Sequence, residues 1–86
     1  MPLYEVLLSK AARKQLAILP AFIHNKIIEN ISNLSALPRP SGCKKLKGYK
    51  NSFRIRVGNY RIIYEIEDKV LRILVIAIGH RKDIYE

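Results

Sequence analysis

Apolar and polar residues along the chain follow two periods, a helical one in the first half and a strand-like one in the second. Apolar residues recur every three or four positions from Phe22 to Leu34, which predicts an amphipathic helix that ends at about Ala36. A shorter helix is expected before it, because Ser9 is a good N-cap for the residues that follow. Pro20 has no N–H to donate to a continuing helix, so we expect the two helices to form a hairpin.

The second half of the chain shows the two-residue alternation of β-strands. Residues 52–57 and 60–66 each place apolar side chains on one face and a more polar set on the other. Residues 58–59 between them are Gly-Asn, a pair typical of a tight hairpin turn. Residues 70–78 are apolar at nearly every position, as in a central strand, and residues 3–8 predict a short opening strand.

This order of elements predicts an α+β fold, in which an N-terminal strand and a helical hairpin pack on a mainly antiparallel sheet of about four strands. The chain has 86 residues and no repeat or linker, so we expect one domain over residues 1–86. The longest apolar run, 73–78, is far shorter than the roughly 18 residues of a membrane span, and no secretory signal is visible. The single cysteine, Cys43, cannot form an internal disulfide, which fits a cytoplasmic protein.

Positive charge is concentrated in the middle of the chain. Sixteen Lys and Arg against seven Asp and Glu give a net charge of +9, and no acidic residue occurs between Glu29 and Glu65. Such a field attracts polyanions, of which nucleic acid is the commonest, although a basic protein without such a partner has the same composition. The basic residues of segment 39–64 are Arg39, Lys44, Lys45, Lys47, Lys50, Arg54, Arg56 and Arg61.

Several arginines are expected on one face of the sheet. Arg54 and Arg56 share a strand face opposite the apolar residues, which leaves them on the side that the helices do not cover. The tight hairpin brings Arg61 onto the neighbouring strand, and Arg81 follows the end of the last one. Four arginines close together repel one another, so the arrangement favours a bound polyanion; the alternative is a set of solvated strand residues.

The sequence lacks the residue patterns that mark other kinds of catalytic or cofactor site. The sequence has no paired carboxylates, no Cys/His spacing of a metal site and no Gly-rich phosphate loop, so no metal or other cofactor is expected. His24 lies in a predicted helix and is read as structural or solvated. His80 stands beside Arg81 and near Tyr85, and histidine exchanges protons near neutral pH, which makes it a candidate for proton transfer.

Three segments together resemble the RelE branch of the RelE/ParE toxin superfamily: residues 45–48 (KLKG), 53–66 (FRIRVGNYRIIYEI) and 79–85 (GHRKDIY). The resemblance covers the whole chain. It implies a toxin of a type II toxin–antitoxin pair, with the same helical hairpin on an antiparallel sheet. It also implies a ribosome-dependent mRNA endoribonuclease that enters the A site, cuts the message and so inhibits translation. The partners implied are the ribosome, mRNA and a cognate antitoxin, acidic and partly disordered, that wraps the toxin.

The resemblance also assigns roles to individual residues. Arg54 and Arg56 match two basic positions of the strand after the KLKG block, and Arg61 matches a residue that contacts the scissile phosphate. Arg81 matches a proposed general acid, and Tyr85 matches a tyrosine that stacks on or orients the substrate nucleotide.

The implied reaction is attack of an RNA 2′-OH on the adjacent phosphate, without a metal ion. Some members carry lysine at the positions of Arg54 and Arg56, and one such lysine is their proposed base; an arginine is a poor base. The base is therefore His80, or the reaction relies mostly on charge stabilisation. Phosphates of the RNA are expected to be positioned by Lys44, Lys45, Lys47 and Lys50.

Two other functions stay open at this point. ParE-like members of the superfamily inhibit DNA gyrase and cut no RNA, but Arg81 and Tyr85 favour the RelE branch. A non-catalytic RNA-binding module is the second alternative, since aromatic residues are interleaved with the basic ones and can stack on bases. These aromatic residues are Tyr49, Phe53, Tyr60 and Tyr64, of which the last three are expected in the core.

Overall fold

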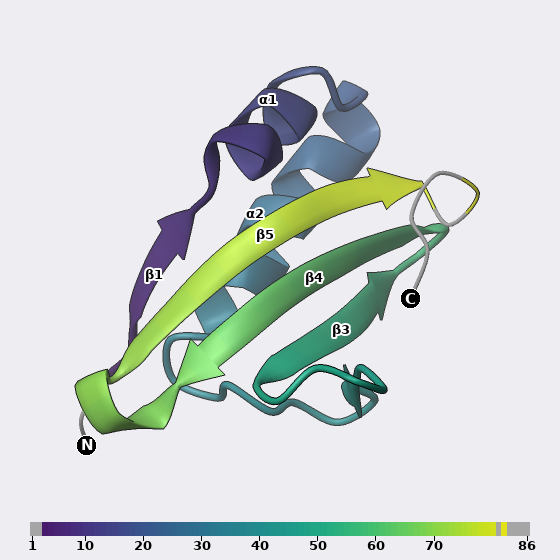
Figure 1. Ribbon diagram of the computed structural model, residues 1–86. Coiled ribbons are helices and arrows are strands. Elements are labelled where there is room, and N and C mark those ends of the chain that lie inside the picture. The colour runs from purple at the N-terminus through teal and green to yellow at the C-terminus, as the bar shows by residue number, and fades with distance from the viewer. Residues whose placement is uncertain (1–2, 81, 83–86) are drawn as a thin grey trace.

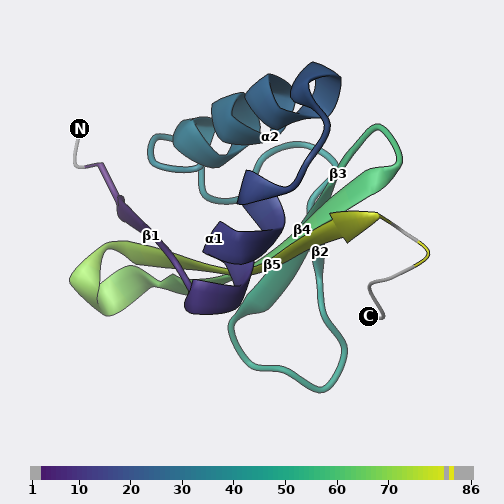
Figure 2. The same ribbon diagram turned by 90° about the horizontal axis from the view of Figure 1, so that it is seen from above.

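The computed structural model describes residues 3–80 and Lys82, which form a sheet with two helices on one face (Figures 1 and 2). The five strands are hydrogen-bonded in the order β1-β5-β4-β3-β2. The elements are β1 (Glu5–Leu8), α1 (Lys10–Ala17), α2 (Ala21–Asn33), β2 (Lys44–Lys45), β3 (Ser52–Val57), β4 (Tyr60–Glu67), the 3₁₀ helix η1 (Asp68–Val70) and β5 (Arg72–His80).

The helical hairpin is confirmed. The Ser9 side chain caps α1 by accepting a hydrogen bond from the Ala12 N–H at 3.0 Å, and Pro20 is the N-cap of α2. α2 ends at Asn33, earlier than the expected Ala36. The next N–H groups bond to carbonyls three residues back, as from Ala36 to Asn33, so the last turn tightens out of the α-helix.

The sheet differs from the prediction in one strand. Pairing between β3 and β4 and between β4 and β5 is antiparallel, whereas β1 and β5 are parallel. The prediction of about four strands was one short, because the two-residue strand β2 adds an edge beside β3. β5 continues to His80, although residues 79 and 80 were expected in the tail.

The main core lies between the helices and one face of the sheet, which we call the helix face; the other is the open face. The predicted alternation holds in β3 and β4, where Ile55, Ile62 and Tyr64 are buried on the helix face. In β5 a bulge shifts the register, because Ile63 pairs with Ala77 but Tyr64 with Val75. The core residues are Ala12, Ile23, Ile27, Ile31, Leu34, Ile55, Val57, Ile62, Tyr64, Ile66, Ile73, Val75 and Ile78.

A polar cluster joins the loop after α2 to η1. Asp68 accepts hydrogen bonds from Arg39 at 2.8 and 3.3 Å and from the Tyr4 hydroxyl at 2.6 Å. The Arg39 guanidinium lies 5.2 Å from the centroid of the Phe53 ring, within cation–π range. Arg39, and then Tyr4, lower the pKa of the Asp68 carboxyl below its ordinary value by hydrogen bonding to its charged form.

Replacing Arg39 by glutamine is therefore expected to move the pKa of Asp68 back up toward its ordinary value. A carboxyl with a lowered pKa in the folded protein stabilises that state above about pH 4, and this contribution is lost as the pH falls. The change in stability should be small, because both side chains are about half exposed. An NMR titration of the Asp68 carboxyl measures the shift. An unchanged titration curve in R39Q would contradict it.

Candidate nucleic-acid interface and active site

Arg56 and Arg61 form the centre of the candidate site. They are cross-strand partners in the β3–β4 hairpin, so their side chains start from neighbouring positions on the open face. The turn between the strands is possible because Gly58 adopts φ +61°, in the left-handed region that favours glycine. With Gly58, Asn59 and Tyr60, the two arginines line a cleft of about 90 Å³. A cleft of this size with two guanidiniums suits a phosphate group.

Arg54 lies two residues before Arg56 on the same face, but its depth differs from the prediction. It is only 4% exposed, whereas both guanidiniums of β3 were expected on an uncovered surface. Its cross-strand partner Ile63 and the loop residue Leu46 are buried too, although neither belongs to the main core. The loop from β2 to β3 projects on this side of the sheet, away from the helices (Figure 2). Strand alternation predicts a face and not how deeply a residue is covered.

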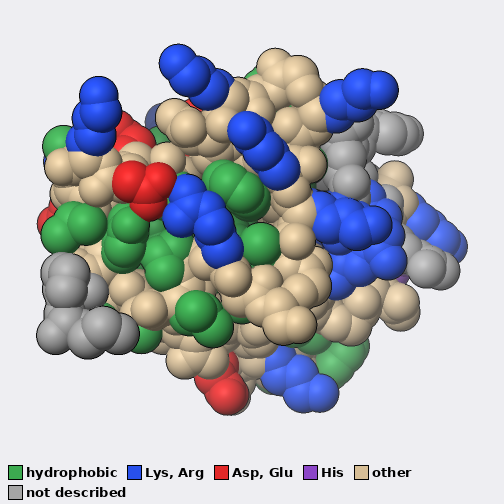
Figure 3. Space-filling model, turned by 90° about the horizontal axis from the view of Figure 1, so that it is seen from below, with side chains coloured by type: hydrophobic (Ala, Val, Ile, Leu, Met, Phe, Trp, Pro, Cys, Tyr) green, Lys and Arg blue, Asp and Glu red, His purple; other side chains and the backbone are tan. Residues whose placement is uncertain are grey.

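The predicted lysines lie along the β2 edge of the sheet. Lys44 pairs with Arg54, and Lys45 pairs with Phe53. Lys47 and Lys50 follow in the loop before β3, and all four lysines are exposed. Lys and Arg side chains gather along the top and right of Figure 3, while the acidic ones lie at the left and bottom. The structure thus brings the lysines to the edge beside the strand that carries Arg54 and Arg56.

The other end of the open face has a different charge balance. Arg72 lies 3.6 Å from Glu5 and 3.9 Å from Glu67, the two residues that flank it in the sheet. At the hairpin end, Arg56 pairs with Arg61 across the two strands, and Arg61 pairs with Gly79 of β5. Two guanidiniums on neighbouring positions attract an anion to this end of the face.

His80 lies on the opposite face from the arginines. It pairs with Tyr60 at the end of the sheet, and its ring meets the Tyr60 ring edge-on, with 5.4 Å between the centroids. Its Nδ1 accepts a hydrogen bond from the Lys82 N–H at 3.2 Å. The structure does not bring His80 beside Arg56 and Arg61. The other predicted site residues, Arg81 and Tyr85, lie outside the described residues.

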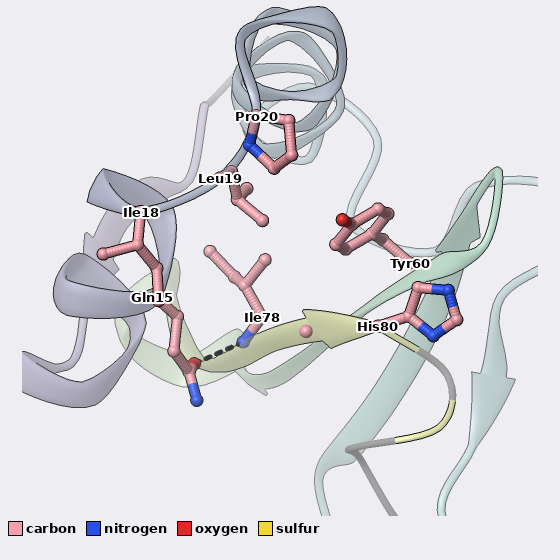
Figure 4. A pocket seen from close by; sticks show the side chains of 8 residues that line it. Gln15, Ile18, Leu19, Pro20, Tyr60, Ile78 and His80 are labelled. Carbon is pink, nitrogen blue, oxygen red and sulfur yellow. Dashed lines mark hydrogen bonds between the residues drawn. The ribbon is translucent and has the colours of Figure 1, made fainter.

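Sequence reasoning missed a pocket on the helix face. It has a volume of about 280 Å³ and lies between the α1–α2 link and the ends of β4 and β5 (Figure 4). The Gln15 Oε1 accepts a hydrogen bond from the Ile78 N–H at 2.7 Å and so ties α1 to β5. No sequence motif marks this pocket, because its lining comes from three separate segments: Gln15, Ile18, Leu19, Pro20, Tyr60, Ile78, Gly79 and His80.

Two features are absent from the part of the chain that the structure describes. Over residues 3–80 and Lys82, no group of three or more His, Cys, Asp or Glu side chains is placed to hold a metal ion. No helix within the same residues has the length and apolar character needed to cross a membrane.

Comparison with known proteins decides the family. Residues 6–85 match the model of the ParE toxin of the type II toxin–antitoxin system parDE. The toxin RelE3 of Methanocaldococcus jannaschii is 40% identical over 86 residues, which cover 95% of this chain and 96% of that protein. The chain belongs to the RelE/ParE superfamily of type II toxins. The toxin RelG of Mycobacterium tuberculosis is 31% identical over 83 residues, and this match covers 95% of each of the two chains.

Solved structures of RelE/ParE toxins confirm the fold. The toxin–antitoxin complex RelBE2 of Mycobacterium tuberculosis has a chain with a TM-score of 0.81 and 30% identity, covering 94% of this chain and all of that one. The RelE–RelB complex of Pyrococcus horikoshii matches with a TM-score of 0.82 and 28% identity, over 94% of this chain and 98% of that one. The resemblance seen in the sequence and the RelE-like fold are both confirmed.

Proposed function

We propose that this toxin is a ribosome-dependent endoribonuclease that cuts mRNA without a metal ion and so inhibits translation in the cytoplasm. The observation that carries the proposal is the pair of guanidiniums, Arg56 and Arg61, across the hairpin from each other at one cleft. Two fixed positive charges at a phosphate-sized cleft suit phosphoryl transfer, in which charge develops on the phosphate oxygens.

In the proposed reaction the RNA 2′-oxygen forms a bond to the adjacent phosphorus, and the bond from phosphorus to the 5′-oxygen breaks. The products are a 2′,3′-cyclic phosphate and a free 5′-OH. Arg56 and Arg61 neutralise the charge of the pentavalent intermediate, and each such donor is typically worth about 3–4 kcal/mol. Arg54, which is buried, contributes its charge from beneath this surface. By resemblance, Arg81 protonates the 5′-oxygen and Tyr85 stacks on the nucleotide.

The 2′-OH also has to lose its proton. Arg56 and Arg61 stay protonated and His80 lies on the other face, so we propose that this proton passes to solvent and that charge stabilisation carries most of the rate. The four lysines at the β2 edge bind phosphates of messenger or ribosomal RNA and fix its register.

A cognate antitoxin completes the proposal. Both solved relatives described above are complexes of a toxin with its antitoxin. A chain with a net charge of +9 suits a partner that is acidic and partly disordered, wraps the toxin and covers the basic hairpin end.

Inhibition of DNA gyrase is the second candidate, because the matching family model is that of ParE toxins. The two functions are separated by inducing the protein in cells and mapping the 5′ ends of mRNA while measuring plasmid supercoiling. We expect new 5′ ends within translated coding regions and unchanged supercoiling. A double variant, R56A/R61A, serves as the control and should leave mRNA intact. Gyrase inhibition with uncut mRNA would move the protein to the second function.

A further inference from the structure

We propose that the pocket on the helix face binds one base of the RNA whose phosphate lies between Arg56 and Arg61. This inference rests on the proposed function and names a second contact for the same substrate. The pocket and the arginine cleft are separate cavities that share Tyr60, and the rest of the pocket lining comes from α1, the α1–α2 link and the end of β5.

The walls of the pocket suit a flat, largely apolar ring. Ile18, Leu19 and Pro20 form one side, and Tyr60 and His80 face them from the ends of their strands (Figure 4). The edge-on contact between the two rings holds Tyr60 in place. A base that enters here contacts an aromatic face on one side and aliphatic carbon on the other, the environment that stacking platforms offer in single-stranded RNA sites.

Two polar atoms around the pocket already have hydrogen-bond partners. The Gln15 side-chain oxygen accepts the Ile78 N–H, and the His80 Nδ1 accepts the Lys82 N–H. These bonds keep the walls in place without a ligand. Because most of the lining is apolar, we expect stacking to dominate over hydrogen-bond readout and the pocket to tolerate more than one base.

The pocket and the arginine cleft share a wall at the end of the sheet. Tyr60 lines both cavities, and Gly79, which lines the pocket, pairs with Arg61. A nucleotide chain that crosses this end of the sheet can place a phosphate in the cleft and a neighbouring base in the pocket. A peptide carboxylate can also enter the cleft, but only a nucleotide joins an anion and a flat ring within every unit of its chain, so the two adjacent cavities favour RNA.

The charge around the pocket supports the same ligand. The helix α1 carries Lys10, Arg13 and Lys14 and no acidic residue. Within the described residues, the lining of the pocket contains no acid either. Helix α1 and this lining therefore present no negative charge to the RNA backbone.

The test measures whether the loss of one RNA base and the loss of the Tyr60 side chain affect cleavage through the same contact. Programmed ribosomes carry messages with a single abasic nucleotide at each position near the cut, and cleavage is followed at subsaturating protein. With the wild-type toxin we expect one abasic position to lower kcat/KM about 10-fold, within the range of a lost base stack. In Y60L that penalty should shrink to about twofold or less, because the wall is already missing.

Two further variants keep the test independent of folding. Ile18 is 82% exposed at the rim, so I18A should fold normally and also reduce the abasic penalty. Phe22, 76% exposed and outside the pocket, gives the matched control F22A, which should keep the full penalty. Equal penalties in wild type, Y60L and I18A would overturn the base pocket. It would also be overturned if I18A weakened only antitoxin binding. A wild-type toxin that leaves intact messages uncut contradicts the proposed function itself.

Discussion

Replacement of Arg61 by alanine is expected to slow mRNA cleavage by roughly 10²–10³ under single-turnover conditions. The side chain lies across the hairpin from Arg56 and lines the same cleft, so its loss removes one of the two guanidiniums that line the proposed phosphate site. Lysine should restore only part of the rate, because an ammonium cannot reproduce the paired N–H geometry of a guanidinium. The rate is measured on programmed ribosomes with saturating protein, after circular dichroism has shown that the variant is folded.

The chain supplies its own control for this measurement. Arg72 lies on the same face of the sheet but at the other end, where Glu5 and Glu67 compensate its charge. R72A should therefore cut at nearly the wild-type rate. Similar rates for R61A and R72A would show that general positive charge, and not the cleft, attracts the RNA.

Truncation of Tyr64 to alanine is expected to cost about 3–5 kcal/mol of the free energy of unfolding. Tyr64 is fully buried, its ring stacks on Phe53 with 6.1 Å between the centroids, and its hydroxyl donates a hydrogen bond to the Pro38 carbonyl at 2.8 Å. Burial raises the pKa of this hydroxyl, so it stays protonated as a donor well into the alkaline range. Urea unfolding followed by circular dichroism measures the loss.

A phenylalanine at the same position separates packing from hydrogen bonding. Y64F keeps the ring and leaves the Pro38 carbonyl without this donor, which should cost about 1 kcal/mol. It also preserves the test if Y64A does not fold, because a domain of this size has little stability to lose. A larger loss in Y64F than in Y64A would show that the hydroxyl, and not the ring, anchors the loop after α2.

The elements predicted correctly are those with a clear period or a strong local signal. Ser9, Pro20 and the Gly58 turn act through local backbone chemistry, so they could be read without tertiary information. The two-residue strand β2 could not, because Lys44 and Lys45 show no apolar alternation and pair only through their backbone with β3.

The candidate site was predicted less completely than the fold. Alternation placed Arg54 and Arg56 on one face, but no period in the sequence describes how deeply Arg54 is buried. The position of His80 depends on the bulge in β5. Val75 and Ile78 both face the core although they are three residues apart, and His80 follows Ile78 onto the helix face. Bulges of this kind depend on pairing with the neighbouring strand.

The first strand of this fold has a single neighbour in the sheet, and that neighbour is the last of the described strands to be synthesised. Glu5 pairs with Arg72 and Leu8 with Val75, so β1 has no partner until β5 has been made. A nascent chain that stalls before residue 72 cannot close its sheet or bury the core residues of β5. Toxicity is thereby tied to synthesis of β5, and fragments that terminate before this strand are left without the scaffold that holds the arginine cleft.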